Sequence, residues 1–102
     1  MREVDLAALE TGLAEGATVI DVRERDEYVQ ARVPGVTNIP LSEFVARVEE
    51  IPTEGTVYVI CAVGGRSLQA AQYLAARGVD AVSVAGGTDL WARTGRPVES
   101  GA

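Results

Sequence analysis

The chain has 102 residues, nine basic and fifteen acidic, so its formal net charge at neutral pH is −6. Without a basic cluster, this balance argues against general binding to nucleic acid. All nine basic residues are arginine and histidine is absent, which excludes a lysine Schiff base, a P-loop lysine and any catalytic site that needs an imidazole.

Residues 1–102 are expected to form one domain that buries about two-thirds of its unfolded surface, with 99–102 as a loose tail. A single cysteine, Cys61, makes no internal disulfide and, without histidine, no zinc site. The apolar runs are strand-sized and the N-terminus does not resemble a secretory signal. We therefore expect a cytoplasmic protein with a reduced thiol, no metal, no cofactor and no membrane contact.

Helical and strand-like segments alternate along the chain, which favours an α/β domain around a mostly parallel sheet. Asp5 is suited to cap a first helix that ends at Gly16. The buried face of this helix carries Leu6, Leu9 and Leu13. The segments that follow are a strand over 18–22, a short helix over 24–31, a turn over 33–36 and an extended piece over 38–40.

The second half continues the alternation. Ser42 is expected to cap a helix that stops at Pro52. Its apolar face is Phe44, Val45, Val48 and Ile51. The elements expected after it are a buried strand over 57–60, a helix over 68–77 that ends at Gly78, a strand over 81–84, a turn at Gly86-Gly87 and a last short helix with Leu90 and Trp91.

The stretch that begins at Cys61 is the main functional signal. It lies between the predicted strand over 57–60 and the predicted helix over 68–77, and it contains Gly64 and Gly65. Loop N–H groups and the positive end of the helix converge on the sulfur in such an arrangement and lower the pKa of the thiol. Because no histidine is present to act as a base, Cys61 is expected to be a nucleophile that is already ionised.

The loop residues around this sulfur are the candidate substrate-binding residues. Their backbone N–H groups can surround a terminal sulfur, and the two glycines permit a tight loop. Arg66 adds a permanent charge at the rim that suits an anionic substrate, although it is also suited to pair with an acid. The set is Ala62, Val63, Gly64, Gly65, Arg66 and Ser67.

Three charged residues earlier in the chain are candidates for structural support of the site. Arg23 and Glu27 are four residues apart, a spacing suited to an ion pair. Asp21 is expected to hydrogen bond to backbone near the active loop. Trp91 is expected to pack in the core, with the mouth of the pocket as the alternative, and Ser67 either caps the helix or donates to the loop.

The sequence resembles the rhodanese (thiosulfate sulfurtransferase) family over nearly its whole length. The segments that carry the resemblance are Asp21-Val22-Arg23-Glu24 with Glu27-Tyr28, the stretch 33–40, the loop 61–66, and Gly86-Gly87 with Trp91. Arg32 departs from the pattern, since the family often has histidine there. The resemblance implies an α/β, rhodanese-like fold with about five strands in a mostly parallel sheet and helices on both faces.

The resemblance also implies a function: a sulfurtransferase in which Cys61 carries sulfur as a persulfide, with thiosulfate as a donor and cyanide or a thiol as acceptor. A sulfur-carrier protein or a thioredoxin-like protein is a candidate partner. One alternative is a dual-specificity-type cysteine phosphatase, whose loop has five residues between cysteine and arginine, against four between Cys61 and Arg66. The other is a non-catalytic binding module of the same fold, which typically lacks the cysteine.

Overall fold

The computed structural model describes all residues from Met1 to Ala102. Its centre is one five-stranded sheet in the order β1-β5-β4-β2-β3, and every pair of neighbouring strands is parallel. The strands are β1 (Arg2–Val4), β2 (Thr18–Asp21), β3 (Thr37–Asn38), β4 (Thr56–Ile60) and β5 (Asp80–Val84). The α/β class and the five strands are confirmed, and the sheet is wholly parallel.

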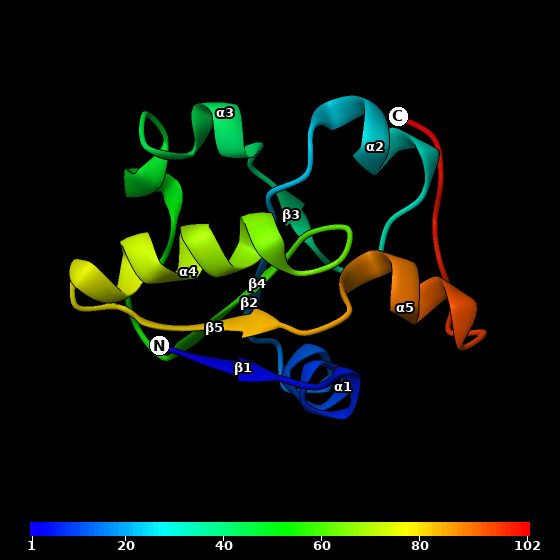
Figure 1. The fold of residues 1–102 in the computed structure, drawn as a ribbon, viewed down its shortest axis with the longest axis horizontal. Coiled ribbons are helices and arrows are strands. Elements are labelled where there is room, and N and C mark those ends of the chain that lie inside the picture. Colours follow the sequence, from blue (N-terminus) through cyan, green and yellow to red (C-terminus); the bar gives the residue numbers. More distant parts are fainter.

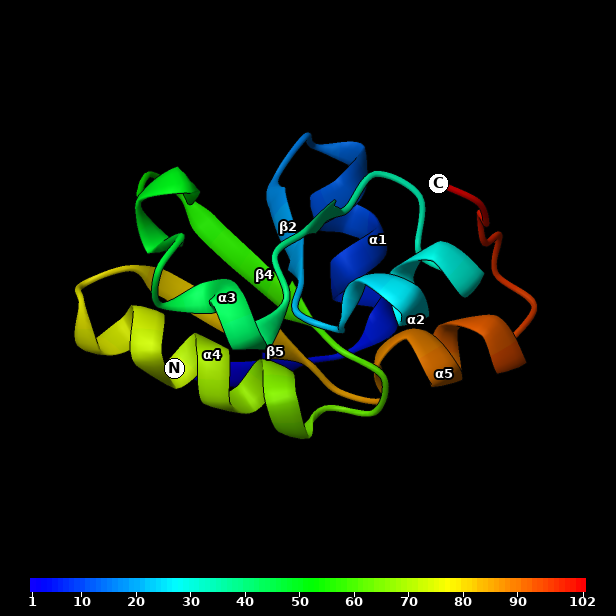
Figure 2. The same ribbon diagram turned by 90° about the horizontal axis from the view of Figure 1, so that it is seen from above.

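Helices cover both faces of this sheet, as a buried parallel sheet requires. They are α1 (Leu6–Ala14), α2 (Arg25–Gln30), α3 (Leu41–Phe44), α4 (Gly65–Ala76) and α5 (Gly87–Arg93), with a 3₁₀ turn, η1, at Val48–Glu50. In Figure 1, α3 and α4 lie above the sheet and α1 lies below it. The view from above shows α2 and α5 together at one end (Figure 2). None of these helices is long and apolar enough to cross a membrane.

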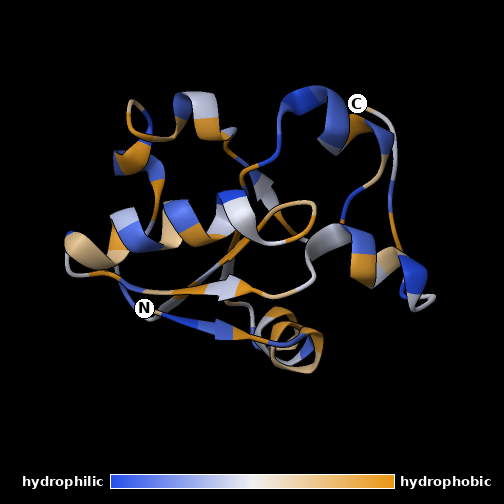
Figure 3. Cartoon of the chain, in the orientation of Figure 1, coloured by the Kyte–Doolittle hydropathy of each residue, from blue (hydrophilic) through white to orange (hydrophobic).

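Two hydrophobic cores, one on each face, follow from the two-residue period of the strands. On β4, Val57 and Val59 belong to the core under α4, whereas Ile60 belongs to the core formed with α1 and α5. The hydropathy colouring of Figure 3 shows hydrophobic residues concentrated along the central strands. Cys61 continues the alternation and lies in the core under α4.

The segment 42–51 differs from the single helix expected there. Helix α3 is one turn long, is preceded by Pro40 at its N-cap, and has no side-chain cap, so the prediction that Ser42 caps it was wrong. Phe44 and Ile51 reach the core from two separate turns, which leaves Val45 63% exposed rather than buried. The spacing of the apolar residues fitted one continuous helix, but only Phe44 and Ile51, near the two ends of the segment, are buried in the core.

Both chain ends are tied to the fold. The edge strand β1, absent from the sequence prediction, pairs with β5. Residues 99–102 were expected to be loose, but Arg32 and Glu99 exchange two backbone hydrogen bonds of 2.9 Å, and the Gly101 N–H donates to the Val29 carbonyl at 2.7 Å. The Arg32 guanidinium also donates to the Gly101 carbonyl at 2.7 Å. The tail prediction failed because its partners lie about 70 residues away.

Candidate active site

Cys61 lies directly after the central strand β4, at the carboxyl end of the parallel sheet. This is the edge at which α/β folds hold their ligands. Its side chain is 1% exposed, which follows from its place in the strand alternation. The sheet therefore fixes the position of the sulfur, and the loop that follows decides what surrounds it.

The loop after Cys61 turns back over the sulfur and runs into α4, which begins at Gly65 instead of Leu68. Gly64 has a φ of 135°, a conformation that side-chain-bearing residues rarely adopt. Its N–H donates to Cys61 Sγ at 3.1 Å. Because α4 starts early, Ser67 lies in its first turn, with its Oγ 3.4 Å from the sulfur.

Two opposing effects act on the Cys61 thiol. Burial alone raises its pKa, since the charged thiolate loses water. Hydrogen bonds from the Ser67 hydroxyl and from the loop backbone outweigh burial, so the net shift of the Cys61 pKa is downward. The backbone donors are the N–H groups of Ser67, Gly64 and Val63. The sequence predicted a lowered pKa for this thiol, and the direction of the shift agrees with that prediction.

The start of α5 holds the other side of the loop. The Cys61 carbonyl accepts from the Thr88 N–H at 2.9 Å, and the Ala62 carbonyl accepts from the Asp89 N–H at 3.0 Å. Gly87 permits this approach: its φ is +59°, and a Cβ there would lie 2.5 Å from the Ala62 carbonyl oxygen. The Gly86-Gly87 pair, expected to be a turn, is thus also a docking surface for the active loop.

Arg66 makes a two-pronged ion pair with Glu27 on α2. Its Nη1 lies 2.7 Å from Glu27 Oε1, and its Nη2 lies 2.9 Å from Oε2. This pair holds the pKa of the Glu27 carboxyl at about 2, chiefly through the Arg66 hydrogen bonds. The acid partner considered for Arg66 is therefore present, and it comes from 39 positions earlier in the chain.

The expected ion pair between Arg23 and Glu27 is not formed. The Arg23 guanidinium instead pairs with the buried Asp21 carboxylate, with Nη2 2.8 Å from Oδ2. Asp21 was expected to bond to backbone near the active loop, but Oδ1 accepts from the Arg23 N–H at 2.9 Å. Asp21 and Arg23 can reach each other because side chains two residues apart in an extended segment point to the same face.

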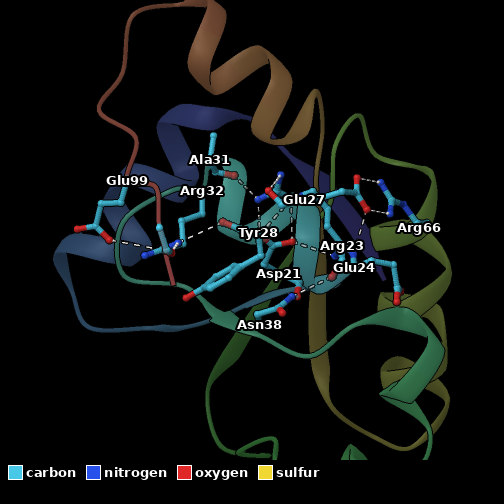
Figure 4. A network of polar contacts seen from close by, with 11 residues as sticks. Asp21, Arg23, Glu24, Glu27, Tyr28, Ala31, Arg32, Asn38, Arg66 and Glu99 are labelled. Carbon is cyan, nitrogen blue, oxygen red and sulfur yellow. Dashed lines mark hydrogen bonds and ion pairs between the residues drawn. The ribbon is translucent and has the colours of Figure 1, made fainter.

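Arg23 then connects this buried pair to α2. Its guanidinium donates to the Glu27 carbonyl at 3.2 Å and to the Ala31 carbonyl at 2.7 Å. Asn38 on β3 donates to the carbonyls of Asp21 and Arg23. Figure 4 shows the series of contacts from Asp21 through Arg23 and Glu27 to Arg66. Asp21 and Arg23 thus hold the helix that carries Glu27, the third candidate for structural support and the partner of Arg66.

One side chain outside the candidate set, that of Ser83, completes the surroundings of the sulfur. Ser83 on β5 lies 2.7 Å from the Ser67 hydroxyl, and both are fully buried. No sequence signal identified Ser83, because it belongs to another strand. Trp91 packs in the core formed with α1 and donates through Nε1 to the Pro97 carbonyl. At the tip of the loop Val63 is 66% exposed, so an apolar side chain borders the mouth of the site.

Comparison with known proteins agrees with this geometry. The family model described as Rhodanese-like domain matches residues 5–94 of this chain. The chain is 34% identical to a sulfurtransferase of Allochromatium vinosum, over 96% of this chain and 94% of that protein. It is 36% identical to the thiosulfate sulfurtransferase GlpE of Actinobacillus pleuropneumoniae serotype 3, over 84% of this chain and 81% of that one.

The fold comparison gives the same result. A rhodanese-related protein of Thermoplasma volcanium superposes with a TM-score of 0.90 and 33% sequence identity, over 97% of this chain and 98% of the other. The family match, the relatives of nearly equal length and the cysteine loop at the carboxyl edge of the sheet agree with one another. The chain belongs to the family of Rhodanese-like domains.

Proposed function

We propose that this protein is a sulfurtransferase that carries a sulfane sulfur on Cys61 as a persulfide, with thiosulfate among its donors. The observation that supports this most is the position of the Cys61 sulfur, which is buried, lies 3.1 Å from a loop N–H and has a lowered pKa. A pre-formed thiolate supplies the nucleophile without a base, which suits a chain that has no histidine.

The reaction has two displacement steps. In the first, the Cys61 thiolate attacks the outer sulfur of thiosulfate, the sulfur–sulfur bond of the donor breaks, and sulfite leaves with the bonding electron pair. The outer sulfur now carries the negative charge of a cysteine persulfide. The loop N–H groups from Ala62 to Ser67 would stabilise this charge, as oriented backbone donors do for other anions.

In the second step an acceptor attacks the outer sulfur and expels the Cys61 thiolate. Cyanide would leave as thiocyanate, and a thiol would leave as its own persulfide. With only one cysteine in the chain, the persulfide has no internal thiol to attack it, so the sulfur must pass to an external acceptor. A sulfur-carrier protein or a thioredoxin-like thiol would meet the exposed Val63 at the loop tip.

Arg66 is proposed to bind the anionic end of the donor. Its ion pair with Glu27 uses one edge of the guanidinium, with one N–H from each of Nη1 and Nη2, and the remaining N–H groups are free for the donor's oxygens. The Glu27 carboxylate holds the guanidinium in place while it cancels part of its charge. We infer that the backbone cradle provides most of the affinity for sulfur, and Arg66 adds selectivity for anionic donors.

A phosphatase is the second candidate because it also uses a cysteine, a loop and an arginine. The loop here has four residues between Cys61 and Arg66, and the Gly64 N–H already lies against the sulfur. A loop of this size suits one sulfur atom better than a tetrahedral phosphate. Parallel turnover assays with thiosulfate and cyanide, and with an aryl phosphate, separate the two activities; no turnover in either would indicate a binding module.

Substitution of Cys61 by serine provides the decisive test. A serine hydroxyl is not ionised near neutral pH, so C61S should fold but carry no sulfur. Mass spectrometry after thiosulfate treatment should show one added sulfur atom on the wild type and none on C61S. Sulfur loading of the variant, or an unmodified wild type that still turns over, would contradict the persulfide mechanism.

A further inference from the structure

Two buried serine hydroxyls lie behind the catalytic sulfur. Ser67 is in the first turn of α4 and Ser83 is on β5, and both are fully buried. Their Oγ atoms are 2.7 Å apart. Ser67 Oγ is also 3.4 Å from Cys61 Sγ and 3.1 Å from the Gly64 carbonyl oxygen. Three elements that meet only in the folded chain thus bring together a short row of hydrogen-bonding atoms.

The hydrogens in this row can be assigned by counting donors and acceptors. The Ser83 hydroxyl makes no hydrogen bond except the one to Ser67. A buried hydroxyl without a partner is costly, so Ser83 donates its hydrogen to Ser67 Oγ. The single hydroxyl hydrogen of Ser67 is then left for one of its two other neighbours, the Gly64 carbonyl or the sulfur.

The Gly64 carbonyl can release this hydrogen at little cost. It also accepts the N–H of Leu68 at 3.1 Å, the first backbone bond of α4. When Cys61 is a neutral thiol, its S–H donates to Ser67 Oγ and the Ser67 hydroxyl donates to the Gly64 carbonyl. When Cys61 is a thiolate, rotation about the Cβ–Oγ bond of Ser67 turns the hydroxyl hydrogen to the sulfur, and the carbonyl keeps its backbone partner. A hydrogen bond to an anion is stronger than one to a neutral carbonyl, which favours this rotation.

From this geometry we propose that Ser83 is a positioning residue for the sulfur-transfer reaction, and that it directs the Ser67 hydroxyl toward the Cys61 thiolate. The inference rests on the proposed role of Cys61 as nucleophile. The Ser83 hydroxyl makes no hydrogen bond to the sulfur; it acts by filling an acceptor site on Ser67, so that Ser67 is left to donate. The relay favours the free thiolate, which is the attacking group of the first step and the leaving group of the second.

The charged groups around the site do not replace this relay. Arg66 on α4 is paired with Glu27 on α2, and Arg23, which follows β2, is paired with the buried Asp21 at the end of that strand. From α5, Asp89 faces the loop through its backbone N–H. The Glu27 carboxyl, with a pKa of about 2, stays ionised over the pH range in which a thiol titrates. The serine relay is an uncharged contribution to the thiolate, alongside the backbone N–H groups of the loop and distinct from these pairs.

The test is the pH dependence of Cys61 alkylation by iodoacetamide, an uncharged reagent that reports the thiolate without sulfur transfer. Loss of one hydrogen bond should make S83A react roughly threefold to tenfold more slowly near neutral pH. The rates should converge at high pH, where the thiol is ionised in every variant. S67A should show at least the same loss, and S100A, which removes an exposed hydroxyl from the C-terminal segment, should match the wild type.

The double variant S67A/S83A distinguishes a relay from a packing effect. Because Ser83 acts only through Ser67, the double variant should react like S67A alone. Additive losses, or an S83A profile that superimposes on the wild type, would overturn the proposal. S83V, which also lacks the donor but fills the space with methyl groups, provides the same comparison if S83A does not fold. Since alkylation needs no sulfur donor, absence of sulfur transfer by the wild type would be seen separately, as failure of the proposed function.

Discussion

At the scale of single residues, the pairing of Arg66 with Glu27 determines how charge acts at the mouth of the site. In the proposed function, Arg66 brings a positive charge that favours an anionic donor, and the Glu27 carboxylate holds the guanidinium in place while it opposes that charge. The two effects can be separated because either partner can be removed alone.

R66A and E27Q should therefore have opposite effects on the use of thiosulfate. R66A removes the positive charge and leaves the Glu27 carboxylate facing the donor, so kcat/KM should fall by roughly tenfold or more. E27Q keeps the arginine and removes the opposing charge, so kcat/KM should be maintained or rise. Methanethiosulfonate, a monoanion with the same transferable sulfur, is the matched donor and should show smaller changes. Equal losses in both variants would indicate that the pair only positions the loop.

The same ion pair predicts a pH dependence of stability. The pKa of Glu27 is lowered from 4.5 in the unfolded chain to about 2 in the fold, so its contribution to the free energy of unfolding is fully present above the unfolded pKa. This contribution is lost as the pH falls from the unfolded pKa to the folded pKa, because the unfolded carboxyl binds its proton first. The pair is partly exposed, so about 1 kcal/mol is expected. Urea unfolding should show the gap between wild type and E27Q closing between about pH 4.5 and about pH 2; a constant gap would contradict this.

At the scale of elements, the contact between the active loop and the start of α5 depends on the absence of a side chain at Gly87. Two neighbouring carbonyl groups, those of Cys61 and Ala62, occupy the space in which a Cβ would lie. Gly95, at the end of α5, has a similarly positive φ of 80° but nothing within 4 Å of a built Cβ. Both glycines thus have a left-handed backbone, but only Gly87 has other atoms packed where a side chain would lie.

G87A should consequently cost much more than G95A. Both variants pay for an alanine at positive φ, about 1 kcal/mol. G87A must also displace the loop, so its total loss in denaturant unfolding should exceed that of G95A by about 2 kcal/mol or more. Cys61 alkylation should slow in G87A and not in G95A. Similar losses and similar alkylation rates in the two variants would show that the loop is not held from this side.

The elements also show where local sequence signals are a sufficient guide. The helix expected from 24–31 is observed as α2, with Glu24 as its N-cap and the reciprocal contact of Glu24 with Glu27. The helix expected from 42–51 was divided, because Phe44 and Ile51 have core positions that a continuous helix was not needed to supply. The capping box alone was enough to mark the short α2, which buries no residue, whereas an apolar stripe fails as a guide where distant packing selects only some of its residues.

At the scale of the whole molecule, the C-terminal segment ties α2 to the rest of the fold. The Arg32 guanidinium stacks on the Tyr28 ring, with 4.5 Å from its carbon to the ring centroid, and its Nε lies 3.8 Å from the Glu99 carboxylate. The segment runs past α2 in Figures 1 and 2. These contacts give Arg32, where the family often has histidine, a structural use in this chain.

Removal of residues 99–102 should lower the stability of the fold without abolishing the reactivity of Cys61. The lost backbone bonds and the exposed ion pair together should contribute about 1–2 kcal/mol. For a domain of this size that lowers Tm by roughly 5–15 °C. Alkylation of Cys61 at low temperature should stay close to that of the wild type, since the loop contacts are unchanged. An unchanged Tm would return the segment to the loose tail expected from the sequence.

The sequence by itself determined the layered α/β architecture, the position of Cys61 at the end of a central strand and the glycine loop that follows. These features depend on local periodicity and on backbone freedom at a few positions. Only the tertiary structure decided that Glu27 pairs with Arg66 instead of Arg23, that Ser83 lies behind Ser67 and that the last residues are bound. These contacts join residues up to about 70 positions apart, and such partners are selected by the packing of whole elements, not by neighbours in the chain.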